Sequence, residues 1–411
     1  MLTQPEHWIS CQIGARENYS IPRALYHQNQ LAHFITDAWV LPQSPLNLFP
    51  KSFLANLRER YHPDLENASV HSFNTTLIQF ELTQKLQKKT GWDKVIARNQ
   101  WFQKQTIKTL TSIADNFINP PILFSYSYAA LELFRFAKQQ GWYTVLGQID
   151  PGLWEEKIVI QEYEKYPQYR GDWQPAPAEY WQNWQEECNI ADAIVVNSHW
   201  SRQLLENTGV ESKKIHIIPL VYTPPKTASK FVRTYPESFS QERPLRVLFL
   251  GQVILRKGIA AVLDAVQLLE GYPVEFWIVG SQQIEIPPHL KTHPQTRWIG
   301  HINRSETDQY YQMTDVFLFP TLSDGFGLTQ LEAQAWKLPI IASRYCGEVV
   351  IDGVNGWILE EVTGDKISIL INSILINTGQ LSFMSDSLNS RYNLRNFNLF
   401  NLSNLLQSLL G

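Results

Sequence analysis

Short runs of apolar, β-branched residues, separated by segments of helical periodicity, recur along this chain and constrain its fold more than any other feature. Four such runs in the second half are LRVLFLG (245–251), VEFWIVG (274–280), DVFLFP (315–320) and PIIAS (339–343). They are almost continuously apolar, which is typical of parallel strands covered by helices on both faces. The segment from Ile259 carries Val262, Leu263, Val266 and Leu269 on one helical face. This order predicts a doubly wound, Rossmann-like α/β domain over residues 245–390.

The first half shows the same alternation less cleanly. Its predicted strands are residues 7–14, 31–37, 94–99, 122–126, 143–149, 193–198 and 215–219. They predict another Rossmann-like domain over residues 1–222. A chain of 411 residues is too long for one ordinary core. We therefore expect two domains that face a central cleft.

Two further segments complete the domain prediction. Residues 223–244 are rich in Pro, Ser and Thr without a sustained period, so they are predicted to be the interdomain linker. In residues 391–411, Leu and Phe alternate with Asn and Ser at helical spacing. This pattern predicts a C-terminal helix packed on one of the lobes, with the first domain as a candidate partner.

Composition excludes several classes of function. The net charge of −4 provides no overall field that would attract nucleic acid. The three cysteines have neither disulfide nor zinc-site spacing. The first residues lack the pattern of a signal peptide, and no apolar run is long enough to span a bilayer. We expect a cytoplasmic protein.

The first candidate binding loop is GQVILRKG, residues 251–258, which leaves a strand and enters a helix. In open α/β sheets, ligands bind beyond the carboxyl ends of the strands, where helix N-termini offer N–H groups. Arg256 and Lys257 beside two glycines indicate a phosphate site. A plain strand-to-helix turn with solvated cations is the alternative.

The second loop is SDGFGLTQLEAQA, in which Asp324 precedes two glycines and Glu332 follows eight residues later. Glycines allow close approach to backbone N–H groups, and the Glu332 carboxylate can accept from two vicinal hydroxyls. Alternatively, Asp324 caps the helix and Glu332 is a solvated surface residue. A third loop, at Gly14 after the first strand, is a weaker candidate for the acceptor side.

These motifs, together with CGEVVIDGVNGWIL, resemble the retaining GT-B glycosyltransferases of family 4 (glycosyl transferases group 1). The resemblance covers residues 244–360 and also 191–220, which is similar to the end of the family's first lobe. It implies that Lys257, with Arg256, neutralises the donor diphosphate, that Glu332 holds the ribose, and that Asp324 lies at the transferred sugar. The donor-binding positions that it implies are Gly251, Gln252, Arg256, His301, Ile302, Gly325, Phe326, Gly327 and Leu328.

The chain departs from the family pattern at three places. Asp324 replaces the usual Glu, and Gln252 replaces the usual Arg of the phosphate site. The family's acceptor-side His is also missing, because Ser125, Tyr126 and Ser127 follow the corresponding strand. Tyr126 and Gly14 are therefore the residues predicted on the acceptor side.

The resemblance implies transfer of a sugar from a nucleotide-sugar to a glycan, lipid-linked or small-molecule acceptor, with retention at the anomeric carbon. Lys257 and helix N-termini can stabilise the leaving phosphate without a metal, and no Asp-x-Asp pair occurs. We expect no metal and no cofactor. A regulator or scaffold that binds nucleotide-sugar without turnover, and a GT-B epimerase or hydrolase, are the alternatives.

A basic stretch lies between residues 85 and 108, interleaved with Trp92, Trp101 and Phe102. Its cations are Lys85, Lys88, Lys89, Lys94, Arg98, Lys104 and Lys108. The favoured interpretation is a solvated helix face with core aromatics. The alternative is peripheral contact with an anionic membrane at the inner face.

Overall fold

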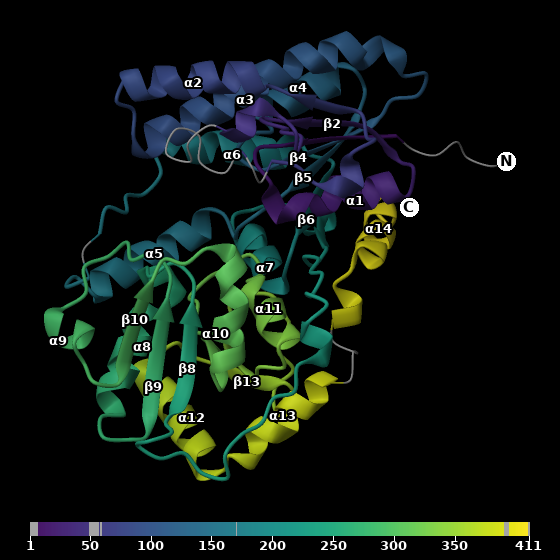
Figure 1. Cartoon of the computed structure of the whole chain (residues 1–411). Helices are drawn as coiled ribbons and strands as arrows, with labels where there is room; N and C mark the ends of the chain where they lie inside the picture. Colours follow the sequence, from purple (N-terminus) through teal and green to yellow (C-terminus); the bar gives the residue numbers. More distant parts are fainter. Residues whose placement is uncertain (1–6, 49–56, 58–59, 170, 390–393, 410–411) are drawn as a thin grey trace.

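The computed structural model describes residues 7–48, 57, 60–169, 171–389 and 394–409 and shows two α/β lobes (Figure 1). The start of the predicted first domain and both ends of the predicted C-terminal helix lie outside these residues. The first lobe has a parallel sheet of order β3-β2-β1-β4-β5-β6-β7. Its strands are β1 (Trp8–Gln12), β2 (Leu31–Thr36), β3 (Val70–Ser72), β4 (Ile122–Tyr126), β5 (Tyr143–Gly147), β6 (Ala193–Val196) and β7 (Ile215–Ile217).

The helices of this half cover both faces of that sheet, and its strands β1, β4 and β6 are accordingly buried on both sides. They are α1 (Ser20–His27), α2 (Asn74–Leu86), α3 (Gly91–Ile113), α4 (Leu131–Gln139), α5 (Leu153–Lys165), α6 (Ala178–Ile190) and α7 (His199–Asn207). Two separate clusters of buried side chains pack on its two faces.

The second lobe is a parallel sheet of order β10-β9-β8-β11-β12-β13, so the predicted GT-B fold class is confirmed. Its strands are β8 (Leu245–Leu250), β9 (Val274–Val279), β10 (Thr296–Gly300), β11 (Val316–Phe319), β12 (Ile340–Ser343) and β13 (Gly356–Leu359). Its helices are α8 (Ile259–Leu268), α9 (Pro288–Lys291), α10 (Thr307–Met313), α11 (Thr329–Ala335), α12 (Gly364–Ile376) and α13 (Gly379–Asn389). The predicted apolar face of α8 is buried. The arrows of β8, β9 and β10 point toward the first lobe, so ligand-binding strand ends face the other lobe (Figure 1).

One predicted strand is wrong. Residues 94–99 belong to the long helix α3, and the strand that pairs with β2 at the edge is instead β3. Lys94 and Arg98, one helical turn apart, both bind the carboxylate of Glu81 on α2. Arg98 also donates to the buried Asp37 at 2.7 Å. Val95 and Ile96, which are both β-branched, favour a strand locally, but packing of α3 against α2 makes the segment helical.

The basic stretch is spread over α2 and α3. Trp101 stacks on Phe80 and Phe102 is fully buried, as the interpretation of a helix face with core aromatics predicted. Several lysines, including Lys85 and Lys88, remain exposed. Of the helices described, none is by itself long and apolar enough to cross a membrane, and only the pair Gly364–Ile376 and Gly379–Leu388, bent by 96°, meets that test together.

The segment predicted as the linker packs along the second lobe. The Arg233 guanidinium donates to the backbone carbonyls of Tyr311, Thr314 and Trp336, at 2.5 Å to Tyr311. Tyr235 donates to the carbonyl of Asp315 at 3.2 Å. These bonds engage backbone carbonyls at the ends of α10 and α11 and just before β11. Residues 223–244 are therefore packed on the second lobe and are not a flexible linker.

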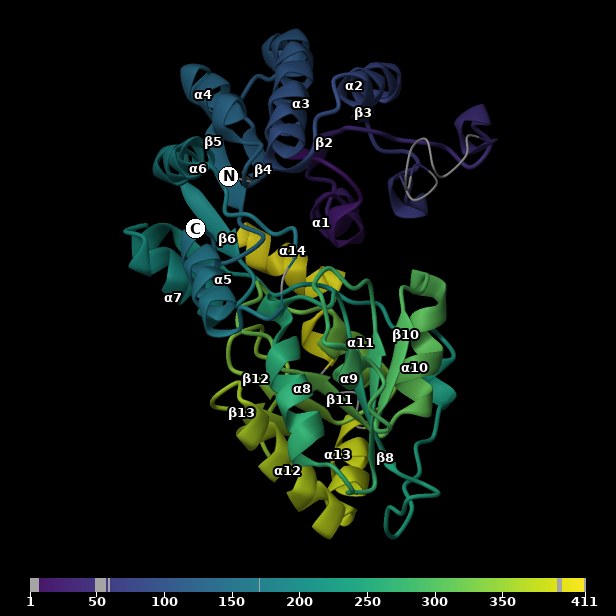
Figure 2. The same cartoon turned by 90° about the vertical axis from the view of Figure 1, so that its left-hand side faces the viewer.

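The chain returns to the first lobe at its end. Helix α14 (Leu399–Gln407) lies against α1, where Leu402 and Leu406 are buried and the Ser403 hydroxyl donates to the Ala24 carbonyl at 3.2 Å (Figure 2). On its way, the Phe397 carbonyl accepts from the Tyr222 N–H at 3.0 Å. The lobes are thus joined by two chain crossings.

The lobes also touch directly where their strand ends meet. Gly325, after β11, faces the backbone of Ile149, after β5, so closely that a Cβ atom at 325 would lie 2.4 Å from the Ile149 carbonyl oxygen. Trp200 at the start of α7 donates from Nε1 to the Ser323 hydroxyl at 3.1 Å. The His199 N–H donates to the Glu348 carboxylate at 3.0 Å. Backbone contact at residue 325 therefore sets the spacing of the lobes.

Helix α5 extends this contact onto the second lobe (Figure 1). Tyr166, just after α5, donates to the Asp264 carboxylate at 3.0 Å, and Tyr169 is buried in the second lobe's core. Gly171 then forms a β-bridge with Ile284. Tyr166, Tyr169 and Gly171 thus precede the second lobe in sequence but are bound to it.

Inside the first lobe, the buried Glu187 on α6 organises the start of α4. Its carboxylate accepts from the N–H groups of Tyr128 at 2.7 Å, Ala130 at 2.9 Å and Leu131 at 3.1 Å. These are donors that the first helical turn leaves unsatisfied. We expect Glu187→Ala to lower the free energy of unfolding by about 2–4 kcal/mol, because three buried donors lose their acceptor.

Urea denaturation monitored by circular dichroism would measure this loss. The matched control is Glu186→Ala on the same helix, whose exposed ion pair with Arg135 should contribute less than about 1 kcal/mol. Equal midpoints for the two variants would contradict the capping role of Glu187.

Gly325→Ala should push the lobes apart, because its Cβ meets backbone rather than a flexible side chain. Small-angle X-ray scattering should show a larger radius of gyration with little change in far-UV circular dichroism. Gly379→Ala is the control, since its Cβ would meet only the Asn377 side chain, at 3.4 Å. An unchanged radius for Gly325→Ala would refute the spacing argument.

Candidate active site

The loop after β8 is held against the end of β11 by a glycine. Gly258 has a φ of 76°, and a Cβ atom there would lie 1.9 Å from the Pro320 carbonyl oxygen. No other residue fits this approach. The short helix Leu255–Lys257 before it therefore places Arg256 and Lys257 beside the residues that follow β11.

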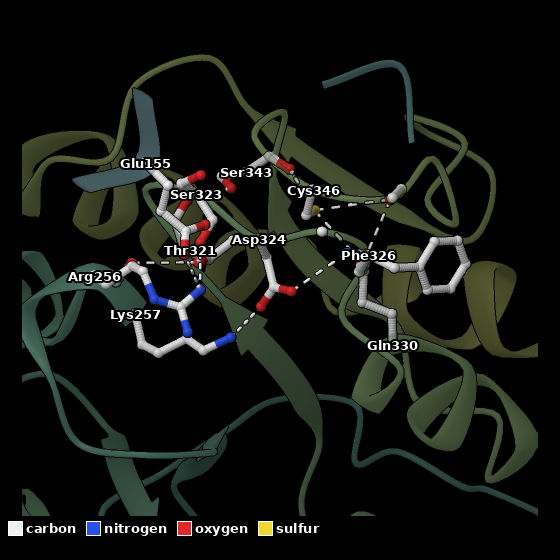
Figure 3. Close-up of polar contacts among 12 residues, drawn as sticks. Glu155, Arg256, Lys257, Thr321, Ser323, Asp324, Phe326, Gln330, Ser343 and Cys346 are labelled. Carbon is white, nitrogen blue, oxygen red and sulfur yellow. Dashed lines mark hydrogen bonds and ion pairs between the residues drawn. The ribbon is translucent and has the colours of Figure 1, made fainter. Parts of the chain in front are cut away.

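Lys257 and Asp324 form an ion pair at this junction (Figure 3). Each side chain is only 16% exposed, and Asp324 Oδ1 also accepts from the Phe326 N–H at 3.3 Å. Burial by itself raises the pKa of Asp324, but Lys257 and Arg256 outweigh it and hold that pKa below its ordinary value. The capping interpretation of Asp324 is therefore only part of its role, since the same carboxylate pairs with a buried cation.

Arg256 connects this pair to the first lobe. Its Nη1 donates to the Ser323 carbonyl at 2.9 Å and lies 3.4 Å from Oε1 of Glu155 on α5 (Figure 3). The pKa of Glu155 is raised to about 7, mainly by burial; Arg256 opposes this rise, while Asp150 and Asp324 add to it. A carboxyl group poised near neutrality thus lies where the lobes meet.

Glu332 lies in the first turn of α11 and is not a solvated surface residue. Its side chain is 14% exposed, and Oε2 accepts from the Tyr311 hydroxyl at 2.9 Å. Oε1 lies 4.0 Å from the exposed Arg304. Burial raises the pKa of Glu332, whereas Tyr311 and Arg304 lower it. Tyr311 therefore fixes Oε2 of Glu332, whereas Oε1 lies on the side of the exposed Arg304.

The loop between the two carboxylates has four predicted donor-binding positions, and they differ in role. Gly327, with a φ of 84°, passes over the ring of Phe319, and Leu328 precedes the first residue of α11. Phe326 is buried at 3% exposure, so its side chain belongs to the core. Gly325 was expected to let a ligand approach its backbone. In the structure, the backbone of Ile149 in the first lobe occupies the space that a side chain at 325 would need.

The remaining donor-side predictions line the strand ends of the second lobe. Gly251 directly follows β8, and the exposed Gln252 comes next. Gly300, with a φ of 78°, turns the chain after β10, so that His301 is exposed and Ile302 packs against the lobe's core. Among the predicted donor-side side chains, Lys257 and Asp324 form an ion pair, and Arg256 binds the neighbouring Ser323 carbonyl; Glu332 lies on α11 with Tyr311.

The two acceptor-side predictions lie in the first lobe. The Gly14 N–H donates to Asp37 at 2.9 Å, and a Cβ there would lie 2.4 Å from Arg60 Nη1, so the protein's own guanidinium fills the space expected for an acceptor. Tyr126 lines a cavity of about 180 Å³ and donates to the buried Glu17 at 3.0 Å.

Sequence reasoning missed the contribution of the QIDPGLWEE segment that follows β5. It carries Asp150 and Glu155, and both lie at the interface between the lobes. The signal was present, because ligand-binding groups gather at the carboxyl ends of parallel strands and this segment leaves such an end. What could not be read was that α5 reaches the second lobe.

Comparison with known proteins supports the resemblance to glycosyltransferases. Residues 233–388 match the sequence model of the family described as Glycosyl transferases group 1. CapM of Staphylococcus aureus, a capsular polysaccharide biosynthesis glycosyltransferase, is 30% identical over 138 residues, which are 30% of this chain and 36% of CapM. AmsK of Erwinia amylovora, an amylovoran biosynthesis glycosyltransferase, is 24% identical over 195 residues, 43% of this chain and 46% of AmsK. The chain thus matches less than half the length of each of these two relatives.

The structure is similar to solved structures over nearly its whole length. HepE of Anabaena, in complex with UDP and glucose, superposes with a TM-score of 0.59 at 13% identity, covering 98% of this chain and 99% of HepE. At such low identity the superposition establishes the fold. Residues 233–388, which carry the Lys257–Asp324 pair and Glu332, thus match the glycosyl transferases group 1 family, and the chain as a whole has a two-lobed GT-B fold.

Proposed function

We propose that the chain transfers a sugar from a nucleotide-sugar to a glycan-type acceptor with retention of anomeric configuration and without a metal. The observation that carries this proposal is the buried cluster of Lys257, Arg256 and Asp324 between the ends of β8 and β11. Lys257 and Arg256 supply positive charge where a diphosphate would lie, and the raised pKa of Glu155 limits the negative charge beside Arg256.

Each residue has a part in this proposal. Lys257, shared between Asp324 and the diphosphate, stabilises the charge that grows on the leaving phosphate as the sugar bond breaks. Asp324 accepts from hydroxyls of the transferred sugar, and Glu332, oriented by Tyr311, accepts from the ribose hydroxyls. Arg256 supplies the cation that Gln252 lacks, since its guanidinium lies beside Ser323 and contributes to the low pKa of Asp324.

Two kinds of relative support the choice of substrates. HepE has been solved with UDP-glucose, so UDP-sugars are the first donors to test. CapM and AmsK are named for polysaccharide biosynthesis, which favours a growing glycan as the acceptor. Metal independence rests on Lys257 and Arg256 as built-in positive charge.

The decisive assay incubates the protein with UDP-, GDP- and ADP-sugars and a cell-derived acceptor fraction, and measures nucleotide release and donor-induced thermal stabilisation. We expect release that rises with acceptor and persists in EDTA, with an α-linked product from an α-linked donor by NMR. Stabilisation without release would identify a nucleotide-sugar-binding regulator instead. Release that stops in EDTA and returns with a divalent cation would contradict metal independence.

Lys257→Ala should lower turnover by about a hundredfold or more, because the leaving phosphate loses its principal cation. Lys257→Arg keeps the charge and should retain more activity. Since Asp324 would be left buried and unpaired, thermal unfolding must show that the variant is folded. Lys213→Ala, which removes an exposed lysine far from the site, is the control. Normal turnover in folded Lys257→Ala would refute this assignment.

Glu332→Ala should raise the donor KM by roughly ten- to a hundredfold, since a charged acceptor of ribose hydroxyls is lost. Initial rates at varied donor concentration measure this change, with the exposed Glu361→Ala as the matched control. A donor KM equal to that of the control would remove Glu332 from the donor site.

A further inference from the structure

A cavity of about 620 Å³ lies between the lobes, next to the proposed donor site. The first lobe contributes Trp92 at the start of α3, residues of α5, and the start of α6. The second lobe contributes Gln252, residues 254–256 and residues 282–283. Its volume is within the range of about 300–1,000 Å³ typical of small-molecule sites. Gln252 and Arg256 of the predicted GQVILRKG loop lie on its edge, but no sequence motif indicated its aromatic wall.

Aromatic side chains form much of its wall. They are Trp92, Tyr128, Tyr163, Trp173, Tyr180 and Trp181. All six are partly exposed rather than buried in the core. Tyr163 and Trp173 are stacked, with ring centroids 5.2 Å apart and an interplanar angle of 11°, and so are Tyr128 and Tyr180, at 4.8 Å and 18°. Such paired, flat faces suit the C–H face of a pyranose ring, which is apolar and rigid.

Two carboxylates of the cavity, those of Asp150 and Glu156, accept hydrogen bonds from its other wall residues and from the adjoining backbone. Asp150 accepts from the Tyr128 hydroxyl at 2.5 Å and from the Gly152 N–H at 2.9 Å. Glu156 accepts from the Trp181 indole at 2.8 Å and from the Ala176 N–H at 2.5 Å. These bonds fix the aromatic rings in place before any ligand arrives, which lowers the entropy cost of binding.

Other polar groups stay available to a ligand. Oε2 of Glu155 is buried and makes no hydrogen bond of good geometry among the described residues, although the Ser323 side chain also lowers the pKa of Glu155. In the same described part of the chain, no hydrogen bond engages the side-chain amides of Gln252 or Gln283. A carboxylate and two amides, which both donate and accept, match the hydroxyl groups of a sugar.

The first-lobe wall of the cavity disfavours an anionic ligand. Its acids are Asp150, Glu155, Glu156 and Asp172, whereas the one cation in the described lining, Arg256, lies on the second-lobe wall beside the proposed donor site, 3.4 Å from Glu155. A uronate held against the first-lobe wall would meet the negative charge of Asp150, Glu156 and Asp172. A neutral, hydroxyl-rich ligand would not.

We propose that this cavity binds the acceptor, and that the part of the acceptor held there is an uncharged saccharide. The inference rests on the proposed transfer, because the wall at Arg256 continues through Ser323 to Asp324 and Lys257. An acceptor hydroxyl oxygen forms the new bond to the anomeric carbon as the bond from that carbon to the diphosphate breaks. The diphosphate leaves with the electron pair and a phosphate oxygen takes the hydroxyl proton.

Saturation-transfer difference NMR with free sugars tests the cavity without any donor. The probes are methyl glycosides of glucose, galactose, mannose and N-acetylglucosamine, with methyl glucuronide as the charged counterpart. We expect at least one neutral glycoside to bind saturably, and the glucuronide to bind about tenfold more weakly because of the acidic wall.

Trp173→Ala should weaken the best neutral probe by about tenfold, whereas Trp173→Phe should largely restore binding, because a flat ring returns. Tyr272→Ala, which removes a 43% exposed aromatic elsewhere on the second lobe, should bind like the wild type. Binding that is absent for every neutral probe, or equal in Trp173→Ala and Tyr272→Ala, would overturn the proposal.

The proposed transfer is judged separately, from nucleotide release by the wild-type protein. Release without any glycoside binding would sustain the transfer and refute the cavity as its acceptor site. Glycoside binding that depends on Trp173, in a protein that turns over no nucleotide-sugar, would sustain the saccharide site and refute the transfer.

Discussion

The arrangement of the whole site depends on the backbone contact between Gly325 and Ile149. Both residues follow parallel strands, β11 in the second lobe and β5 in the first, and only the absence of a side chain at 325 lets them meet. This contact brings the carboxyl ends of two sheets to the same interface, where helix N-termini and loop residues offer their polar groups. Trp200 and α5 then fix the lobes on either side of it.

Charge is distributed across this interface in a defined order. Lys257 and Asp324 lie on the second-lobe side, Arg256 lies between them and Glu155, and Asp150 stands on the first-lobe side. Positive charge is therefore concentrated where a diphosphate would leave, and negative charge where a neutral acceptor would enter. The same order accounts for the opposite pKa directions of Asp324, which two cations hold low, and Glu155, which burial and two acids raise.

The aromatic cavity also explains why residues 166–178 leave the first lobe. Tyr169 is buried in the second lobe's core, and Gly171 pairs with Ile284, so Trp173 is carried to the cavity by a segment anchored on the opposite lobe. Trp92 donates to the Gln174 carbonyl at 2.9 Å and ties that segment to α3. Acceptor binding in this cavity is therefore expected to depend on lobe spacing, since both lobes supply its walls.

The sequence by itself determined the two-sheet fold, because short apolar runs such as LRVLFLG, alternating with helical segments, are typical of parallel strands buried on both faces. It also located Lys257, Asp324 and Glu332, since glycine-bounded loops and charged residues at strand ends carry their meaning locally. It was wrong at residues 94–99, where two β-branched residues sit in α3 and packing against α2 decides the conformation. It did not show that Gly325 receives Ile149, that Arg60 fills the space at Gly14, or that Glu155 meets Arg256. Those contacts join residues far apart in the chain, and only the packing of one lobe on the other decided them.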